Sequence, residues 1–177
     1  RIIALILTIG LLLSCLQITT IAADAAVVVA EDCSVTQGGY AYVYLRAKNF
    51  VNVAALDIAI YYDSSAMSID YTSNSSFLNS AQVSTNTATS GVIKMSAMAL
   101  NGLNSSDSGS RMMTIRFRIN SDCPAGDYPI FVTVGDAYDN DMNTTRISGV
   151  NGTITVKKAS TQSFPIYTSI SDTTVQE

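Results

Sequence analysis

The chain contains no histidine and only two glutamates, Glu31 and Glu177, among its 177 residues. Without histidine there is no Ser–His or Cys–His catalytic dyad and no histidine-ligated zinc. A glycosidase-type pair of carboxylates would have to be built almost wholly from aspartate. Because the usual parts of an enzyme are missing, we expect a protein that is not an enzyme.

Charge is also scarce. Asp, Glu, Lys and Arg make up 14% of the residues and the net charge is -4, whereas typical globular domains carry roughly 25% charged residues. No basic cluster is present, and binding to nucleic acid needs clustered Lys and Arg to neutralise phosphates. The composition therefore disfavours nucleic acid as a partner, and we expect none. Polar character comes from Ser, Thr and Asn instead, which is typical of an extracellular β-protein.

The N-terminal residues 1–25 begin with Arg1, continue as a long apolar run and end in small residues. This order predicts a secretory signal peptide, so the mature protein is expected to be secreted and extracellular, with no membrane insertion. A transmembrane anchor and a lipoprotein processing site at Cys15 are the alternatives. The uninterrupted run is short for a span of about 20 residues, which favours cleavage.

Two cysteines, Cys33 and Cys123, remain after the predicted cleavage. In a secreted protein such a pair can form a disulfide. Two buried thiols are the alternative, because cysteine is common in protein cores. The sequence leaves both open, since the pairing depends on geometry.

Short segments of alternating polarity recur between residues 26 and 156, separated by Gly, Pro and Asn turns. The clearest covers residues 53–63, where Leu56, Ile58 and Ile60 alternate with small or polar residues. No helical pattern of ten or more residues interrupts the series. We expect an all-β sandwich or barrel, with strands near residues 27–35, 40–50, 53–63, 65–71, 91–100, 111–120, 128–137 and 150–156 and a brief extended piece within 73–90.

The second expected strand places an aromatic stripe, Tyr40, Tyr42 and Tyr44, on its outward side. A row of tyrosines could stack on sugar rings, so a secreted carbohydrate-binding β-sandwich is the alternative function. Tyrosine is also simply a good strand former. Beyond the last strand, residues 157–177 lose their periodicity and become rich in Ser and Thr. They predict a linker that is truncated before a further module.

Three motifs carry a family resemblance: NVAALDIAIYYDSS at residues 52–65, SDCPAG at 121–126 and VGDAYDND at 134–141. With the order of strands around them, they resemble the cohesin modules of bacterial cellulosomal scaffoldins over residues 26–156. The resemblance implies a nine-stranded β-sandwich with jelly-roll topology, monomeric by itself and without a cofactor. It also implies a partner, a calcium-loaded dockerin module carried by a polysaccharide-degrading enzyme or another scaffoldin.

The resemblance also implies a flat sheet face as the dockerin-binding site, with the calcium held in the dockerin. Family contact positions fall on seven residues of this chain: Ala55, Asp57, Thr87, Lys94, Ser96, Met98 and Met142. We include Ala59 and Leu100 in the same predicted surface, and we add Arg116 on strand parity. An aspartate is unusual in the middle of a strand, which favours a functional role for Asp57.

The loop after residue 138 opens like a calcium-binding loop, with Asp139, Asp141 and Asn143 at alternate positions. An EF-hand loop needs Gly at its sixth position and Glu at its twelfth, where this chain has Thr144 and Val150. We therefore expect a turn rich in Asx side chains and no metal site.

Overall fold

The computed structural model describes residues 25–159. The predicted signal peptide lies outside the described residues except for residue 25, and the predicted linker except for residues 157–159. No helix in the described part is long and apolar enough to cross a membrane.

The protein is an all-β sandwich with one short 3₁₀ helix, η1 (Ser76–Leu78). The strands are β1 (Val27–Ala30), β2 (Cys33–Thr36), β3 (Tyr40–Lys48), β4 (Val53–Tyr61), β5 (Met67–Asn74), β6 (Gln82–Asn86), β7 (Val92–Leu103), β8 (Ser110–Ile119), β9 (Gly126–Asp139), β10 (Ser148–Val150) and β11 (Gly152–Lys157). The predicted fold class is confirmed, but the described residues form 11 strands instead of nine. The first and last expected strands each divide in two, and β6 forms within a stretch read mainly as loop.

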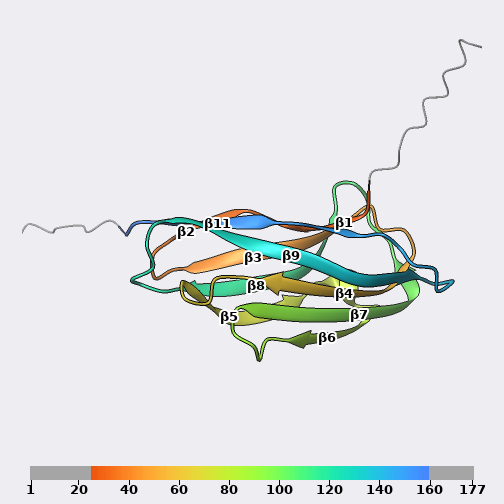
Figure 1. The fold of residues 1–177 in the computed structure, drawn as a ribbon. Helices are drawn as coiled ribbons and strands as arrows, with labels where there is room; N and C mark the ends of the chain where they lie inside the picture. The colour runs from red at the N-terminus through yellow and green to blue at the C-terminus, as the bar shows by residue number, and fades with distance from the viewer. Residues whose placement is uncertain (1–24, 160–177) are drawn as a thin grey trace, which may run out of the picture.

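Two sheets pack face to face (Figure 1). One has the order β10-β1-β3-β8-β5 and the other the order β2-β11-β9-β4-β7-β6. The described chain enters at one end of the sandwich and leaves at the opposite end (Figure 1). Each of the two sheets has one broad outer face, so the sandwich presents two such faces.

The first and last strand pairs change sheet together. β1 pairs with β10 in parallel, and β2 pairs with β11 in parallel in the other sheet. The crossing brings backbones very close, and glycines occupy the tightest points. A Cβ at Gly149 would lie 2.0 Å from the carbonyl oxygen of Val132, and one at Gly152 would lie 2.6 Å from that of Ala30. Only residues without a side chain fit there.

The expected alternation is confirmed along the long strands. In β4 and β7 the inward side chains Leu56, Ile58, Ile93 and Met95 are buried, while their neighbours point outward. In residues 111–120 the alternation places Met113, Ile115 and Phe117 in the core and predicts that Met112 points outward. That prediction is wrong, because Met112 is buried beside Met113. The pairing of β3 with β8 shifts between Leu45 and Arg46, and a bulge lets two consecutive side chains enter the core.

Both cysteines are free thiols in the structure, so the disulfide alternative is wrong and the thiol alternative holds. Cys123 is buried and Cys33 is half-buried. Burial raises the pKa of the Cys33 thiol, and the neighbouring charge of Asp32 adds to the effect. Both cysteines therefore pack as small apolar side chains.

Candidate functional site

The outer surface of the six-stranded sheet carries most of the predicted site. Strand register places Ala55 opposite Met98, Asp57 opposite Ser96 and Ala59 opposite Lys94. We call these six residues the β4–β7 face. Because the inward neighbours are apolar and fill the core, these six must point outward.

Asp57 sits at an irregular point of the sheet. Leu56 pairs with Ala137 and Ile58 with Val134, so two residues of β9, Gly135 and Asp136, lie opposite this single aspartate. Such a bulge disrupts the ladder and redirects the local side chains. Asp57 is exposed, and Gly135 leaves the space beside it open because it has no side chain. The structure therefore presents one strand-centre carboxylate to the outside.

The apolar members of the site gather at one end. Met98 is 57% exposed and Leu100 87% exposed, on the outward side of β7. Met142 is 76% exposed and follows β9, where it has a positive φ of 63°. Asp139 holds this loop, because its Oδ1 accepts hydrogen bonds from the backbone N–H groups of Asp141 and Asn143 at 2.9 and 2.8 Å. The predicted Asx-rich turn is confirmed.

The face is hollowed by two shallow depressions that meet at Asp57 and Ser96. The larger, about 540 Å³, extends toward Met98 and Tyr138. The smaller, about 280 Å³, extends toward Lys94 and Thr133. Thr87 lies just beyond the Lys94 end, in a turn where the side-chain oxygen of Asn86 accepts a hydrogen bond from the N–H of Ala88 at 2.9 Å. Nine of the ten predicted residues thus lie on or beside one surface.

Sequence reasoning missed several residues of this surface. Asp136 and Tyr138 of β9 line the larger depression, together with Gln82 and Ser84 of β6. Strand parity predicts which side chains point outward, but not which strands are neighbours. Nothing in the sequence therefore indicated that β9 lies beside β4. The alternation of Gln82 and Ser84 with Val83 is typical of a strand and could have predicted β6. It is short and lies in a stretch rich in Ser, Thr and Asn, which made it hard to recognise.

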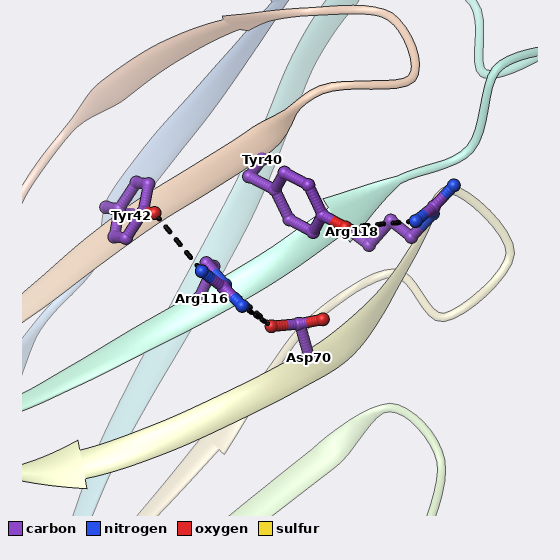
Figure 2. Close-up of polar contacts among 5 residues, drawn as sticks. All are labelled: Tyr40, Tyr42, Asp70, Arg116 and Arg118. Carbon is purple, nitrogen blue, oxygen red and sulfur yellow. Dashed lines mark hydrogen bonds and ion pairs between the residues drawn. The ribbon is translucent and has the colours of Figure 1, made fainter.

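Arg116 does not belong to this surface, so the prediction from strand parity is wrong. It lies on β8, in the five-stranded sheet on the opposite side of the sandwich. There its Nε donates to the carboxylate of Asp70 at 2.6 Å, and its Nη1 donates to the Tyr42 hydroxyl at 3.4 Å (Figure 2). These hydrogen bonds, first to Tyr42 and then to Asp70, raise the pKa of the guanidinium.

The tyrosine stripe points outward as expected, but arginines occupy its rings. The guanidinium of Arg116 lies 4.9 Å from the ring centre of Tyr40 and 6.0 Å from that of Tyr42. Arg111 lies 5.2 Å from the ring centre of Tyr44. Figure 2 shows Arg116 between two of the tyrosines. Cation–π contacts stabilise this surface and compete with any sugar for the same ring faces.

The chemistry available on the β4–β7 face is that of binding. Carboxylates, hydroxyls and thioethers are present, but histidine is absent from the whole chain. Residues 25–159 hold no group of three or more His, Cys, Asp or Glu side chains that could bind a metal ion. A broad, shallow surface with small residues around the carboxylates of Asp57 and Asp136 is suited to a protein partner.

Comparison with known proteins identifies the family. The model of the cohesin domain matches residues 25–156. The chain belongs to the cohesin domain family. Cohesin domains are non-catalytic interaction modules, so this protein is not an enzyme. No curated protein sequence matches this cohesin domain.

Solved cohesins have the same fold. A non-cellulosomal cohesin from the archaeon Archaeoglobus fulgidus is 16% identical with a TM-score of 0.66, over 75% of this chain and 91% of that one. The cohesin in the Coh-OlpA–Doc918 type I cohesin–dockerin complex of Clostridium thermocellum is 19% identical with a TM-score of 0.66, over 76% of this chain and 100% of that one. The seventh ScaB type I cohesin of Pseudobacteroides cellulosolvens is 19% identical with a TM-score of 0.65, over 79% of this chain and 97% of that one.

Proposed function

We propose that this cohesin domain binds a calcium-loaded dockerin through the β4–β7 face. The observation that carries the proposal is the geometry of that face: six outward residues in cross-strand register, with Met98, Leu100 and Met142 exposed at one end. Exposed apolar side chains beside a hydrogen-bonding group are typical of protein interfaces. Membership of the cohesin family and the dockerin in the solved Coh-OlpA–Doc918 complex give the kind of partner.

The arrangement suits a helix of the partner. Ala55 and Ala59 are small, and Gly135 lies beside Asp57, so a rigid element can approach the sheet closely. Asp57 would accept hydrogen bonds from the helix, while Met98 and Leu100 would be covered by apolar side chains. Because the face is built on paired strands, binding needs little backbone change. Calcium would belong to the dockerin.

The biological role follows from the partner. A secreted module of this kind would hold plant-polysaccharide-degrading enzymes, or other scaffoldins, in a cellulosome through their dockerins. The archaeal relative is described as non-cellulosomal, so the role in a cellulosome is a separate proposal from dockerin binding. Isolation of the partners from culture supernatant would test that role.

Calorimetric titration with a panel of dockerins tests the binding itself. We expect binding in calcium and none after the dockerin is stripped with a chelator. Met98→Asp should weaken binding at least 30-fold, since burying an unpaired charge within an interface costs about 2 kcal/mol or more. The matched control is Tyr42→Asp on the opposite sheet, which should bind normally. Normal binding by a folded Met98→Asp variant would refute the assignment of the face.

A further inference from the structure

A second concave surface lies at the other end of β4 and β9. It is a depression of about 450 Å³ lined by four aromatic rings and two carboxylates, those of Tyr61, Tyr62, Tyr128, Phe131, Asp63 and Asp127. None of its lining residues belongs to the β4–β7 face, and none is Lys or Arg. The site therefore combines ring surfaces with acceptors of hydrogen bonds.

Two of these rings are exposed, and within residues 25–159 neither makes a cation–π or ring-stacking contact. Tyr61 and Phe131 lie directly opposite each other in the register of β4 and β9. They are 44% and 48% exposed. Within residues 25–159 no guanidinium lies over either ring and neither is stacked on another aromatic side chain. They differ in this from the stripe of Tyr40, Tyr42 and Tyr44, and a ligand that covers them would bury apolar area.

The depression also carries polar groups with free acceptor capacity. Asp127 accepts one hydrogen bond, from Thr155 Oγ1 at 2.7 Å. Asp63 Oδ1 accepts hydrogen bonds from the N–H and the hydroxyl of Ser65, at 2.9 and 2.6 Å. An ionised carboxylate has about four acceptor positions, so both retain some. The Tyr128 hydroxyl donates a hydrogen bond to the carbonyl oxygen of Pro124 at 2.9 Å, and its own oxygen can still accept one from a ligand.

We propose that this depression is a subsite for a neutral polysaccharide. One sugar residue would lie with its C–H face on Tyr61 and Phe131, while its hydroxyl groups donate to Asp63 and Asp127. A sugar ring supplies both features at once, an apolar face and a rim of donors. Two carboxylates would repel a sugar acid, so the ligand is uncharged. The site is shallow, which suits one residue of a long chain better than a free monosaccharide.

A Lys or Arg side chain of a peptide is the competing occupant, because the same carboxylates attract cations. The rings come from neighbouring strands about 4.8 Å apart and together present a surface broader than one ammonium group covers. The proposal is independent of dockerin binding, since it uses a different part of the sheet. The two functions can therefore be tested separately.

Native gel electrophoresis of the full chain in gels containing soluble polysaccharide tests the proposal. We expect at least one of hydroxyethyl cellulose, xyloglucan and galactomannan to retard the protein, and polygalacturonate to leave it unaffected. The double variant Tyr61→Ala/Phe131→Ala should bind that polymer at least fivefold more weakly. The matched control is Tyr40→Ala/Tyr42→Ala, whose rings are covered by arginine, and it should migrate like the parent protein.

Asp127→Asn provides a second variant in case the double variant is unfolded, as judged by its thermal transition. Asparagine has the shape of aspartate but no charge, so it accepts hydrogen bonds from sugar hydroxyls more weakly. The polysaccharide should therefore retard this variant less than the parent protein. The proposal is wrong if none of the three neutral polymers retards the protein, or if both variants are retarded like the parent. It is also wrong if oligolysine binds at the depression and the neutral polymers do not, or if the double variant loses only dockerin binding.

Discussion

Asp57 on β4 lies directly opposite Ser96 on β7, and Ser96 in turn lies opposite Ser84 on β6. The row therefore runs from one carboxylate through two hydroxyls at the surface of the sheet. Serine side chains are short and leave the carboxylate accessible from above. On its other side the bulge in β9 supplies Asp136. The row is acidic, and it favours a partner that presents hydrogen-bond donors or positive charge.

Asp57→Ala should weaken dockerin binding at least tenfold without unfolding the domain. An aspartate that accepts hydrogen bonds inside an interface contributes about 1.5–3 kcal/mol. Its side chain is exposed in the free protein, so its loss leaves the core intact. Calorimetric titration gives the affinity and the thermal transition reports on the fold. Asp122→Ala, in the exposed loop between β8 and β9, is the matched control and should bind normally. Equal affinity in the two variants would exclude Asp57 as an anchor.

Arg116→Ala should leave dockerin affinity unchanged and lower the stability of the domain. The side chain lies on the sheet opposite the β4–β7 face, where it pairs with Asp70 and lies 4.3 Å from the ring centre of Tyr71. Its removal loses an ion pair and several cation–π contacts at once. Urea unfolding and titration of the same sample separate the two effects. A loss of affinity in a fully folded variant would place part of the interface on this sheet.

Periodicity predicted the strands and their inward sides well, because the core requires apolar side chains at every second position. In β4 the sequence pattern alone identified Leu56, Ile58 and Ile60 as core and Asp57 as surface. The signal is strong where a strand has one buried side. The prediction failed at Met112, because this residue is the extra one in a bulge of β8 and the strict alternation of sides is interrupted there.

The assignment of strands to sheets could not be predicted from the pattern. Arg116 and Asp57 both alternate correctly and both point outward, yet they lie on opposite faces of the sandwich. Which strands pair is decided by long-range contacts, which periodicity does not encode. The same limit hid Asp136 and Thr133, whose strand β9 lies beside β4 although 74 residues separate Ala59 from Thr133 in the chain. The family resemblance supplied site positions on β4 and β7 and in the loops at Thr87 and Met142, but none within β9.

Gly149→Ala should destabilise the domain strongly. A Cβ there would lie 2.0 Å from the carbonyl oxygen of Val132, a backbone atom that cannot move aside without shifting β9. Overpacking of this kind costs about 2 kcal/mol or more. Gly135→Ala is the matched control, since its Cβ would meet nothing closer than Asp57 Cβ at 3.6 Å. Urea unfolding measures both. Equal stabilities would mean that the crossing of β10 over β9 is looser than the structure shows.

The loop that carries Met142 should become less stable at low pH. Hydrogen bonds from Asn143 lower the pKa of the Asp139 carboxyl below its ordinary value of 3.8. A lowered pKa in the folded state means that the ionised carboxylate stabilises the fold. That contribution is fully present above pH 3.8 and is lost as the pH falls through the lower, folded-state pKa.

Thermal unfolding of the parent protein and of Asp139→Ala between pH 6 and pH 2 tests this. The parent should be the more stable above about pH 4, where the carboxylate is ionised in both states. The difference should shrink toward the acid end, because protonation removes from the parent what the substitution removes from the variant. Asp63 titrates in both proteins, so its contribution cancels in the comparison. A difference that stays constant down to pH 2 would show that Asp139 holds the Met142 loop without its charge.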